Sequence, residues 1–301
     1  MKGIILAGGA GTRLYPLTIV TSKQLLPVYN KPMIYYPLST LMLSRIREIL
    51  IISTPEDTPR IKQLLGDGAQ LGLRLEYAVQ EKPEGLAQAF TIGKDFIGDD
   101  SCAMILGDNI FYGNGLGAKL AAAVKASESG EATIFGYYVD DPERFGIMEF
   151  QKTSRITGEG LKVLSVEEKP SCPKSNYAIV GLYYYPAGVS EMAEKVKPSS
   201  RGELEITTLN EMYLNEGRLQ AQLLGRGFTW MDAGTIDSLR RATNFVCMIE
   251  QYQGMSISAP EEIAYWFKWI SREQLKESAE KYGKSPYGEH LRAVLENRIV
   301  L

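Results

Sequence analysis

Residues 3–13, Gly3-Ile-Ile-Leu-Ala-Gly-Gly-Ala-Gly-Thr-Arg13, place a short apolar run directly before a glycine-rich loop. The run predicts a buried strand, because continuous apolar segments of this length are typical of parallel sheets that are covered on both faces. Glycines after a strand let backbone N–H groups approach an anion closely, and a helix that starts beyond them adds a favourable dipole. This stretch therefore favours an α/β fold whose first loop can hold an anion.

Two common nucleotide-binding signatures do not match. The dinucleotide fingerprint needs a glycine where Leu14 stands, and the Walker pattern at Gly283-Lys284-Ser285 needs a glycine where Ser278 stands. What remains is a glycine turn with Arg13 just beyond it and Lys23 further along the chain. Two cations beside backbone N–H groups suit a polyphosphate, although a tight turn with solvent-facing charges explains the same residues equally well.

Apolar runs and amphipathic stretches alternate through the first half of the chain. This alternation predicts a parallel sheet with helices on both faces. The predicted strands are 3–7, 49–53, 73–79 and 102–106, and the predicted helices are 32–45, 56–65, 85–96 and 116–126.

The pattern changes after about residue 131. Four predicted strands follow with few helices between them, which favours mixed or antiparallel pairing; they are 133–139, 147–150, 161–167 and 177–185. Helices are expected at 203–215 and 236–251. The stretch from about residue 260 is expected to be mostly helical, and its aromatic cluster at 265–269 suits a packing or subunit contact better than a ligand site.

Composition excludes several classes of protein. The 301 residues include 33 basic and 36 acidic side chains, and the net charge of −3 gives no electrostatic case for nucleic-acid binding. Three scattered cysteines argue against a disulfide framework, and a single histidine, His290, makes a histidine metal site or a Ser-His-Asp triad improbable. No apolar run approaches the ~20 residues that span a bilayer, and the N-terminus lacks a signal-peptide pattern, so we expect a cytoplasmic protein.

Two aspartates could bind a metal ion. Asp108 follows the apolar run 103–107 and so stands at the carboxyl end of a predicted strand, where ligands bind in open α/β sheets. Asp232 follows a second short apolar stretch. Two carboxylates together with nucleotide phosphates are a usual environment for Mg²⁺. A helix cap or a turn is the simpler explanation of each aspartate taken alone.

Other charged residues could bind a sugar phosphate. In the segment 166–170, Glu168 could bind sugar hydroxyls and Lys169 a phosphate, although a solvated edge strand explains the pair equally well. Arg201 could be a further phosphate ligand or an ordinary surface arginine before a helix.

Several longer motifs together resemble a known family, the sugar-1-phosphate nucleotidylyltransferases. The similarity runs from residue 1 to about residue 265, and within the family it is greatest to the glucose-1-phosphate thymidylyltransferases. The motifs that carry it are 6–18, 22–27, 31–39, 85–89, 107–113, 168–170, 174–177 and 201–207.

The resemblance implies a fold and an organisation. The expected fold is a Rossmann-like mixed, mostly parallel sheet flanked by helices, with a small helical C-terminal part. It implies a nucleotidylyltransferase core at residues 1–240 and a C-terminal helical extension at 241–301 that forms a subunit interface, in a homotetramer.

The resemblance also implies roles for individual residues. Arg13 and Lys23 are the expected catalytic cations, and Asp108 and Asp232 are the expected ligands of a Mg²⁺ cofactor. The implied nucleotide-binding residues are Leu6, Gly8, Gly9, Gly11, Thr12, Arg13, Gln80 and Gly85, of which Gln80 and Gly85 contact the base. The implied sugar-phosphate residues are Asn109, Phe145, Gly146, Glu168, Lys169, Ile179, Tyr183, Arg201 and Trp230.

The implied reaction transfers a thymidylyl group from dTTP to α-D-glucose 1-phosphate, in deoxysugar biosynthesis such as that of dTDP-rhamnose. UTP or another hexose 1-phosphate is the alternative substrate, because one methyl group separates thymine from uracil. A non-catalytic nucleotide-sugar sensor is a further alternative, but both expected cations and both metal ligands are present. A dehydrogenase is disfavoured by Leu14.

Overall fold

The computed structural model describes residues 1–151 and 160–299. Within them, nine strands form one sheet in the order β5-β4-β1-β6-β11-β8-β12-β10-β9. The strands that come first in the chain are β1 (Lys2–Leu6), β4 (Glu48–Ser53), β5 (Arg74–Val79) and β6 (Cys102–Leu106). They pair in parallel, with β1 between β4 and β6. This half confirms the parallel sheet that the alternating pattern predicts.

The second half of the sheet is mixed, as the change of pattern predicts. Its strands are β8 (Ala132–Tyr138), β9 (Gly146–Phe150), β10 (Leu161–Glu168), β11 (Tyr177–Tyr185) and β12 (Leu219–Leu224). β11 runs antiparallel to both of its neighbours β6 and β8, whereas β8 and β12 pair in parallel. β10 runs antiparallel to β12 and β9. The mixed, mostly parallel sheet is therefore confirmed.

Helices cover both faces of the sheet, and alternate residues of β1 face the two different cores. Ile5 of β1 packs into one cluster, while Ile4 and Leu6 pack into the other. The first cluster includes residues of α1 (Tyr35–Leu43), α2 (Thr58–Leu65) and α5 (Leu116–Glu128). The second includes residues of α3 (Gln88–Ile92), α4 (Lys94–Ile97), α6 (Val189–Ala193) and α7 (Ile206–Asn215). Both faces of β1 are buried because its residues are apolar in both directions.

Two short ladders lie outside the main sheet. β7 (Asn109–Gly113) pairs antiparallel with β13 (Phe228–Asp232), and β2 (Pro27–Val28) pairs with β3 (Lys31–Pro32). The sequence patterns predict none of these strands, and they also miss β12. The β7–β13 ladder matters most for the site, because it joins the residues after β6 to the segment that contains Asp232.

One predicted helix is shorter than expected. The pattern predicts a helix over 85–96, but residues 85–87 lie outside the helices α3 and α4. Gly85 has φ +124°, and the backbone of residues 84–87 bonds to Leu204 through Leu204 N–H to Glu84 O and Ala87 N–H to Leu204 O. An α-helix needs φ near −63°, whereas Gly85 has φ +124°. Gly85 therefore cannot be part of the helix.

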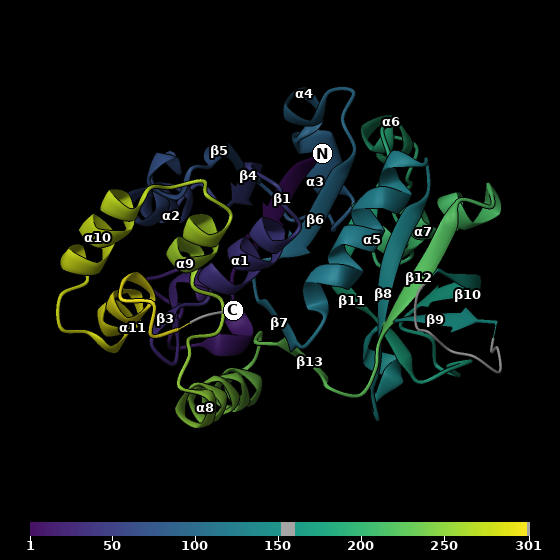
Figure 1. Cartoon of the computed structure of the whole chain (residues 1–301). Coiled ribbons are helices and arrows are strands. Elements are labelled where there is room, and N and C mark those ends of the chain that lie inside the picture. The colour runs from purple at the N-terminus through teal and green to yellow at the C-terminus, as the bar shows by residue number, and fades with distance from the viewer. Residues whose placement is uncertain (152–159, 300–301) are drawn as a thin grey trace.

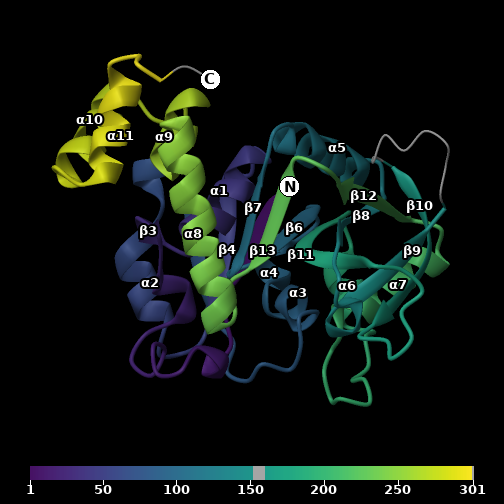
Figure 2. The same ribbon diagram turned by 90° about the horizontal axis from the view of Figure 1, so that it is seen from below.

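The C-terminal helices pack against the N-terminal half. They are α8 (Ile236–Gln253), α9 (Pro260–Trp266), α10 (Arg272–Lys281) and α11 (Pro286–Leu295). Figure 1 shows α9 beside α1, with α10 and α11 at the end of the molecule far from β9 and β10. Figure 2 shows α8 between β13 and α9. The division proposed at residue 240 falls inside α8. No helix among the described residues is long and apolar enough to span a membrane.

The aromatic cluster at 265–269 packs within the chain. The Phe267 and Trp269 rings meet edge to face at 5.2 Å between centroids, and the Arg45 guanidinium lies 3.3 Å from the Phe267 ring centroid. These contacts confirm a packing role for the cluster. Residues 152–159, which stand in the sequence between the predicted strands 147–150 and 161–167, lie outside the described residues.

Candidate active site

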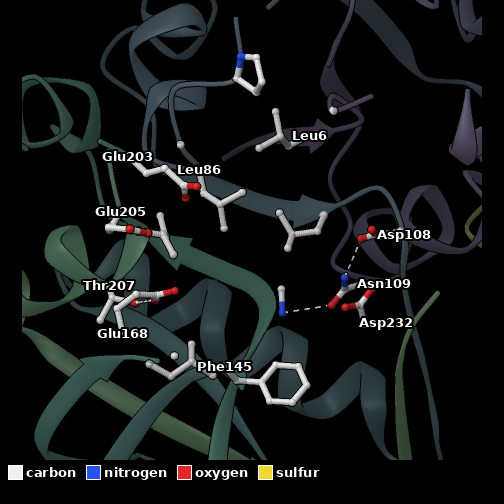
Figure 3. Close-up of a pocket in the computed structure, with 18 of the residues that line it drawn as sticks. Leu6, Leu86, Asp108, Asn109, Phe145, Glu168, Glu203, Glu205, Thr207 and Asp232 are labelled. Carbon is white, nitrogen blue, oxygen red and sulfur yellow. Dashed lines mark hydrogen bonds between the residues drawn. The ribbon is translucent and has the colours of Figure 1, made fainter. Parts of the chain in front are cut away.

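A cavity of about 460 Å³ opens at the carboxyl ends of β1 and β6. The residues that line it include all of those implied by the resemblance except Gly11 and Thr12. They come from parts of the chain between residue 6 and residue 232, which the sheet brings together. Figure 3 shows Asp108, Asn109 and Asp232 on one side of this cavity and Glu168, Thr207, Glu203 and Glu205 on the other.

The glycine loop contributes one wall of the cavity. Gly8 and Gly9 line it, and Gly9 has φ +92°. A Cβ at Gly8 would lie 2.5 Å from Gln80 Oε1, so a side chain there would displace the Gln80 amide. Gly11 and Thr12 lie outside the lining because the loop turns away there: the Gly11 carbonyl accepts a hydrogen bond from Thr18 Oγ1 at 2.8 Å, and Thr12 begins a short 3-10 turn that ends at Leu14.

Asp108, Asp232 and the two cations meet at one end of the cavity. Lys23 Nζ donates to Asp108 Oδ2 at 2.5 Å. A Cβ placed on Gly234 would lie 2.8 Å from Asp232 Oδ1, 2.9 Å from Arg13 Nη2 and 3.4 Å from Asp108 Oδ2. These three groups therefore surround one small space, and a glycine at position 234 keeps it open.

The two carboxyl groups differ electrostatically. Burial opposes ionisation of Asp108, but the charge of Lys23 and hydrogen bonds from Lys23 and Asn109 outweigh it, so the pKa of Asp108 lies below its usual value. Burial and the neighbouring charge of Asp108 raise the pKa of Asp232, and the charges of Lys23 and Arg13 oppose that rise only in part. Asp108 is thus held as an anion, whereas an added positive charge would stabilise the ionised form of Asp232.

This end of the cavity suits a divalent cation with hard oxygen ligands. Asp108 and Asp232 provide such ligands, and the raised pKa of Asp232 indicates a carboxylate that lacks full compensation for its charge. Among the described residues, no group of three or more His, Cys, Asp or Glu side chains could hold a metal ion. A cation here would therefore need water or phosphate oxygens for its remaining ligands, which is the usual habit of Mg²⁺.

Asn109 links the end of the cavity that holds Asp108 and Asp232 to its middle. Its Nδ2 donates to Asp108 Oδ1 at 3.0 Å, and its Oδ1 accepts from Trp230 Nε1 at 2.6 Å and from the Gly181 N–H at 3.2 Å. The Trp230 ring also meets the Phe145 ring at 5.5 Å between centroids. These contacts fix the orientation of the Asn109 amide and place an aromatic wall beside the aspartates.

The far end of the cavity holds a carboxylate and two cations. Thr207 Oγ1 donates to Glu168 Oε2 at 2.6 Å, and Arg201 Nη1 donates to Glu168 Oε1 at 3.3 Å. Lys169 follows with φ 43°, and its Nζ lies 3.7 Å from Glu168 Oε1. A fixed carboxylate suits sugar hydroxyl groups, and the exposed ammonium and guanidinium groups suit a phosphate.

Arg201 is held by three carboxylates. Besides Glu168, its guanidinium pairs with Glu203 at 3.1 Å and with Glu205 at 3.6 Å. Burial lowers its pKa, but the charges of Glu205, Glu203 and Glu168 outweigh this effect and raise it overall. The arginine is therefore positioned at the cavity wall as a permanent cation.

Some lining residues escape the sequence analysis. Thr207, Glu203 and Glu205 lie in the motif 201–207, yet only Arg201 is singled out there. Arg144 precedes Phe145, and its guanidinium lies 5.5 Å from the Phe145 ring centroid. The residues that line the cavity and were not predicted are Pro83, Leu86, Leu106, Arg144, Gly181, Glu203, Glu205, Ile206 and Thr207. The spacing of the motif could have indicated Thr207, but no sequence signal marks Gly181 or Leu106.

Comparisons with known proteins identify the family of this chain. The family model for nucleotidyl transferase matches residues 2–248. A glucose-1-phosphate thymidylyltransferase of Mycobacterium tuberculosis (strain ATCC 25618 / H37Rv) is 54% identical over 296 residues, 98% of this chain and 99% of that protein. One of Neisseria meningitidis (serogroup A) is 52% identical over 98% of this chain and 100% of that protein.

Solved structures show the same fold. A putative glucose-1-phosphate thymidylyltransferase from Bacillus anthracis, solved in complex with a sucrose, is 42% identical with a TM-score of 0.72 over 81% of this chain and 94% of that one. A UDP-glucose pyrophosphorylase solved with UDP-glucose is 20% identical with a TM-score of 0.73, over 82% of this chain and 98% of that one, and supports the fold alone. With a family model over most of its length and relatives more than half identical along nearly all of it, this chain belongs to the nucleotidyl transferase family.

Proposed function

We propose that this protein transfers a thymidylyl group from dTTP to α-D-glucose 1-phosphate and releases pyrophosphate. The observation that carries the proposal is one cavity with a glycine loop, two cations and two carboxylates at one end, and the Glu168 carboxylate with two more cations at the other. Relatives named glucose-1-phosphate thymidylyltransferase at 52–54% identity support the choice of both substrates.

The reaction is a single in-line displacement. A phosphate oxygen of glucose 1-phosphate attacks the α-phosphorus of dTTP, the bond from that phosphorus to the α–β bridging oxygen breaks, and pyrophosphate leaves with the bond's electron pair. The attacking oxygen is already an anion near neutral pH, so no general base is needed. This suits a cavity whose lining contains no histidine. The main obstacle is the approach of two anions, which positioning and cationic stabilisation overcome.

The proposed roles divide the cavity along its length. Gly8 and Gly9 lie against the triphosphate, and Arg13 stabilises the leaving pyrophosphate. Lys23 neutralises charge that develops at the reacting phosphate. Gln80 and Gly85 contact the base, while Glu168 binds sugar hydroxyls between Lys169 and Arg201, which bind the sugar phosphate. No covalent intermediate is expected, since the described residues that line the cavity include no serine, cysteine or histidine.

Asp108 and Asp232 are the proposed ligands of Mg²⁺. When bound, the ion neutralises charge on the phosphate oxygens of both substrates. Lys23, which donates to Asp108 and lines the same cavity, would neutralise charge at the reacting phosphate. Asn109 keeps the Asp108 carboxylate oriented throughout.

UTP or another hexose 1-phosphate would undergo the same chemistry. Thymine and uracil differ by one methyl group, a difference worth about 1–3 kcal/mol in an apolar pocket, so some use of UTP is expected. We also propose that the product is used in deoxysugar biosynthesis, such as that of dTDP-rhamnose. The protein is expected to be cytoplasmic and to form a homotetramer. Light scattering on the purified protein tests the tetramer.

Pyrophosphate release tests the proposed function directly. The purified protein is incubated with Mg²⁺, glucose 1-phosphate and, in turn, dTTP, UTP, ATP, CTP or GTP, and the sugar nucleotide is identified by mass spectrometry. We expect dTTP to give the highest kcat/KM and removal of Mg²⁺ by a chelator to abolish release. Equal use of UTP would keep the reaction and remove the thymidylyl specificity. No release with any nucleotide and a panel of hexose phosphates would favour the non-catalytic sensor.

A further inference from the structure

The side chain of Gln80 lies beneath the glycine loop with its two amide atoms in different surroundings. Gln80 is buried, and its Oε1 lies against the α-carbon of Gly8, 2.5 Å from where a Cβ would be. Its Nε2 points the other way and donates to Gln88 Oε1 at 2.7 Å. An amide oxygen only accepts hydrogen bonds and an amide NH₂ only donates them, so the direction of this side chain decides what the cavity wall offers.

Gln88, in the first turn of α3, holds that direction. Its Oε1 accepts two hydrogen bonds, from Gln80 Nε2 and from the Glu84 backbone N–H at 3.1 Å. If the Gln88 amide turned over, its NH₂ would face two donors and both hydrogen bonds would be lost.

Glu84 fixes Gln88 in turn. Gln88 Nε2 donates to Glu84 Oε2 at 2.8 Å, and a carboxylate can only accept. The Glu84 carboxylate therefore fixes the direction of every hydrogen bond from Glu84 to Gln80. Because Glu84 can only accept, Gln88 must turn its NH₂ group toward Glu84. The Gln88 oxygen is then left to accept from Gln80 Nε2. The Gln80 oxygen is then directed to the glycine loop. Across the residues that the structure describes, 1–151 and 160–299, no donor from the chain reaches Gln80 Oε1.

The backbone under these side chains is fixed independently. Leu204 N–H donates to Glu84 O at 2.6 Å and Ala87 N–H donates to Leu204 O at 3.1 Å. Substitution of the Gln88 side chain therefore leaves the preceding residues 84–87 attached to Leu204. Gln80, unlike Gln88, lines the cavity.

We propose that Gln88 is a specificity-determining positioning residue, which together with Glu84 holds the Gln80 carbonyl oxygen at the cavity wall beside Gly8. With the base placed against Gln80 and Gly85, as in the proposed function, this oxygen selects a pyrimidine with a hydrogen on N3. Thymine and uracil carry N3–H, a donor, whereas cytosine has a lone pair there and would face the Gln80 oxygen as a second acceptor. Discrimination of this kind is strong because the wrong base leaves a buried acceptor unpaired. This inference rests on the proposed function and extends it to the exclusion of dCTP.

Three variants test whether specificity depends on the direction in which the Gln80 amide points. Gln88→Met removes the acceptor and frees Gln80 to turn over. Gln88→Lys offers only donors, so the Gln80 oxygen turns to it and the NH₂ group faces the base. The exchange Glu84→Gln with Gln88→Glu keeps an acceptor beside Gln80 Nε2 and serves as the matched control. Gln70→Met, at an exposed glutamine that does not line the cavity, controls for the substitution itself.

The measurement is the ratio of kcat/KM for dTTP to kcat/KM for dCTP, with circular dichroism and equilibrium binding of both nucleotides for each variant. We expect the ratio to fall about tenfold in Gln88→Met and further in Gln88→Lys, with kcat for dTTP retained. The exchanged pair and Gln70→Met should keep the wild-type ratio. A general structural defect would lower both kcat/KM values together and leave the ratio unchanged.

The outcomes distinguish the two proposals. If wild-type protein prefers dTTP and the ratio is unchanged in Gln88→Met and Gln88→Lys, then Gln88 does not set specificity although the proposed function stands. If wild-type protein shows no preference for dTTP over dCTP, then the proposed function itself is contradicted. If either single variant unfolds, the other variant and the exchanged pair decide between these results.

Discussion

The backbone carbonyl oxygen of Asp108 accepts a hydrogen bond of 2.9 Å from the N–H of Ala233. This bond continues the β7–β13 ladder, in which Asp232 stands opposite Asn109. Two aspartates from distant parts of the sequence are thereby held beside each other by backbone pairing. The relationship explains why the site can keep two like charges close together: the ladder fixes their positions, and Lys23 and Arg13 supply the compensating charge.

Replacement of Lys23 tests its proposed role in the reaction. Lys23→Met removes the cation that faces Asp108, and we expect kcat for pyrophosphate release to fall about 10²–10³-fold, the usual cost of losing one charge-stabilising donor. Lys174→Met, at an exposed lysine that pairs with Glu167 outside the cavity, should keep wild-type turnover. Circular dichroism verifies that both variants fold. Turnover of Lys23→Met within a factor of a few of wild type would remove Lys23 from the mechanism.

Loss of the proposed metal ligands tests the cofactor. We expect Asp232→Asn to raise the Mg²⁺ concentration for half-maximal rate at least tenfold, because only two carboxylates are available to the ion. Asp237→Asn, at an exposed residue of the first turn of α8, is the matched control and should leave the Mg²⁺ dependence unchanged. Initial rates across a Mg²⁺ series, after treatment with a chelator, give both numbers. A chelated wild-type enzyme that retains full activity would exclude the ion from the reaction.

Gly85 is predicted to be intolerant of a side chain. A Cβ there would lie 2.4 Å from Leu204 O and 2.5 Å from Leu204 N, and φ is +124°. Gly85→Ala must push the loop away from Leu204, so we expect a loss of about 2–4 kcal/mol in unfolding free energy and a KM for dTTP raised about tenfold. Gly202→Ala has a positive φ of +76° but open space around it, and should lose only about 1–2 kcal/mol. Equal losses in both variants would show that the contact with Leu204 is unimportant.

The sequence could predict elements that depend on local pattern. The strand before the glycine loop and the strand before Asp108 are apolar runs with clear ends, and both form as predicted. The charged residues Glu168 and Arg201 could be proposed from their side chains, whereas residues such as Ile179 and Tyr183, whose place in the cavity no periodicity indicates, came only from the motif resemblance.

Features that depend on pairing between distant segments could not be predicted. The strand Asn109–Gly113 has neither strict alternation nor a long apolar run, and it exists because Phe228–Asp232 pairs with it. The role of Glu84 depends on the backbone hydrogen bonds to Leu204, which hold residues 84–87 in a non-helical conformation. Such contacts follow from the tertiary structure, and local propensity yields to them.

Glu262 gives a prediction for the pH dependence of stability. Its side chain is buried on α9, and its Oε2 lies 2.8 Å from His290 Nε2. Burial raises the pKa of Glu262, and the neighbouring charge of Glu250 raises it further. The contact with His290 and the charge of Lys31 lower it, but the net shift is upward from 4.5. A raised folded-state pKa means that stability from this group is fully present below pH 4.5 and is lost as pH rises through the folded-state value.

We therefore expect Glu262→Gln to gain stability relative to the wild-type protein as pH increases from about 4.5 toward neutrality, since a neutral amide in the same place carries no buried charge. Glu289→Gln is the control of opposite sign, because hydrogen bonding and the charge of Arg292 lower the pKa of Glu289. That exposed variant should lose a little stability relative to the wild type over the same range. Urea unfolding of the three proteins at several pH values between 4 and 8 gives the differences. If the difference between Glu262→Gln and the wild type stays constant or reverses as pH rises, Glu262 is ionised in the folded protein at little cost, and its partners His290 and Lys31 compensate for its burial completely.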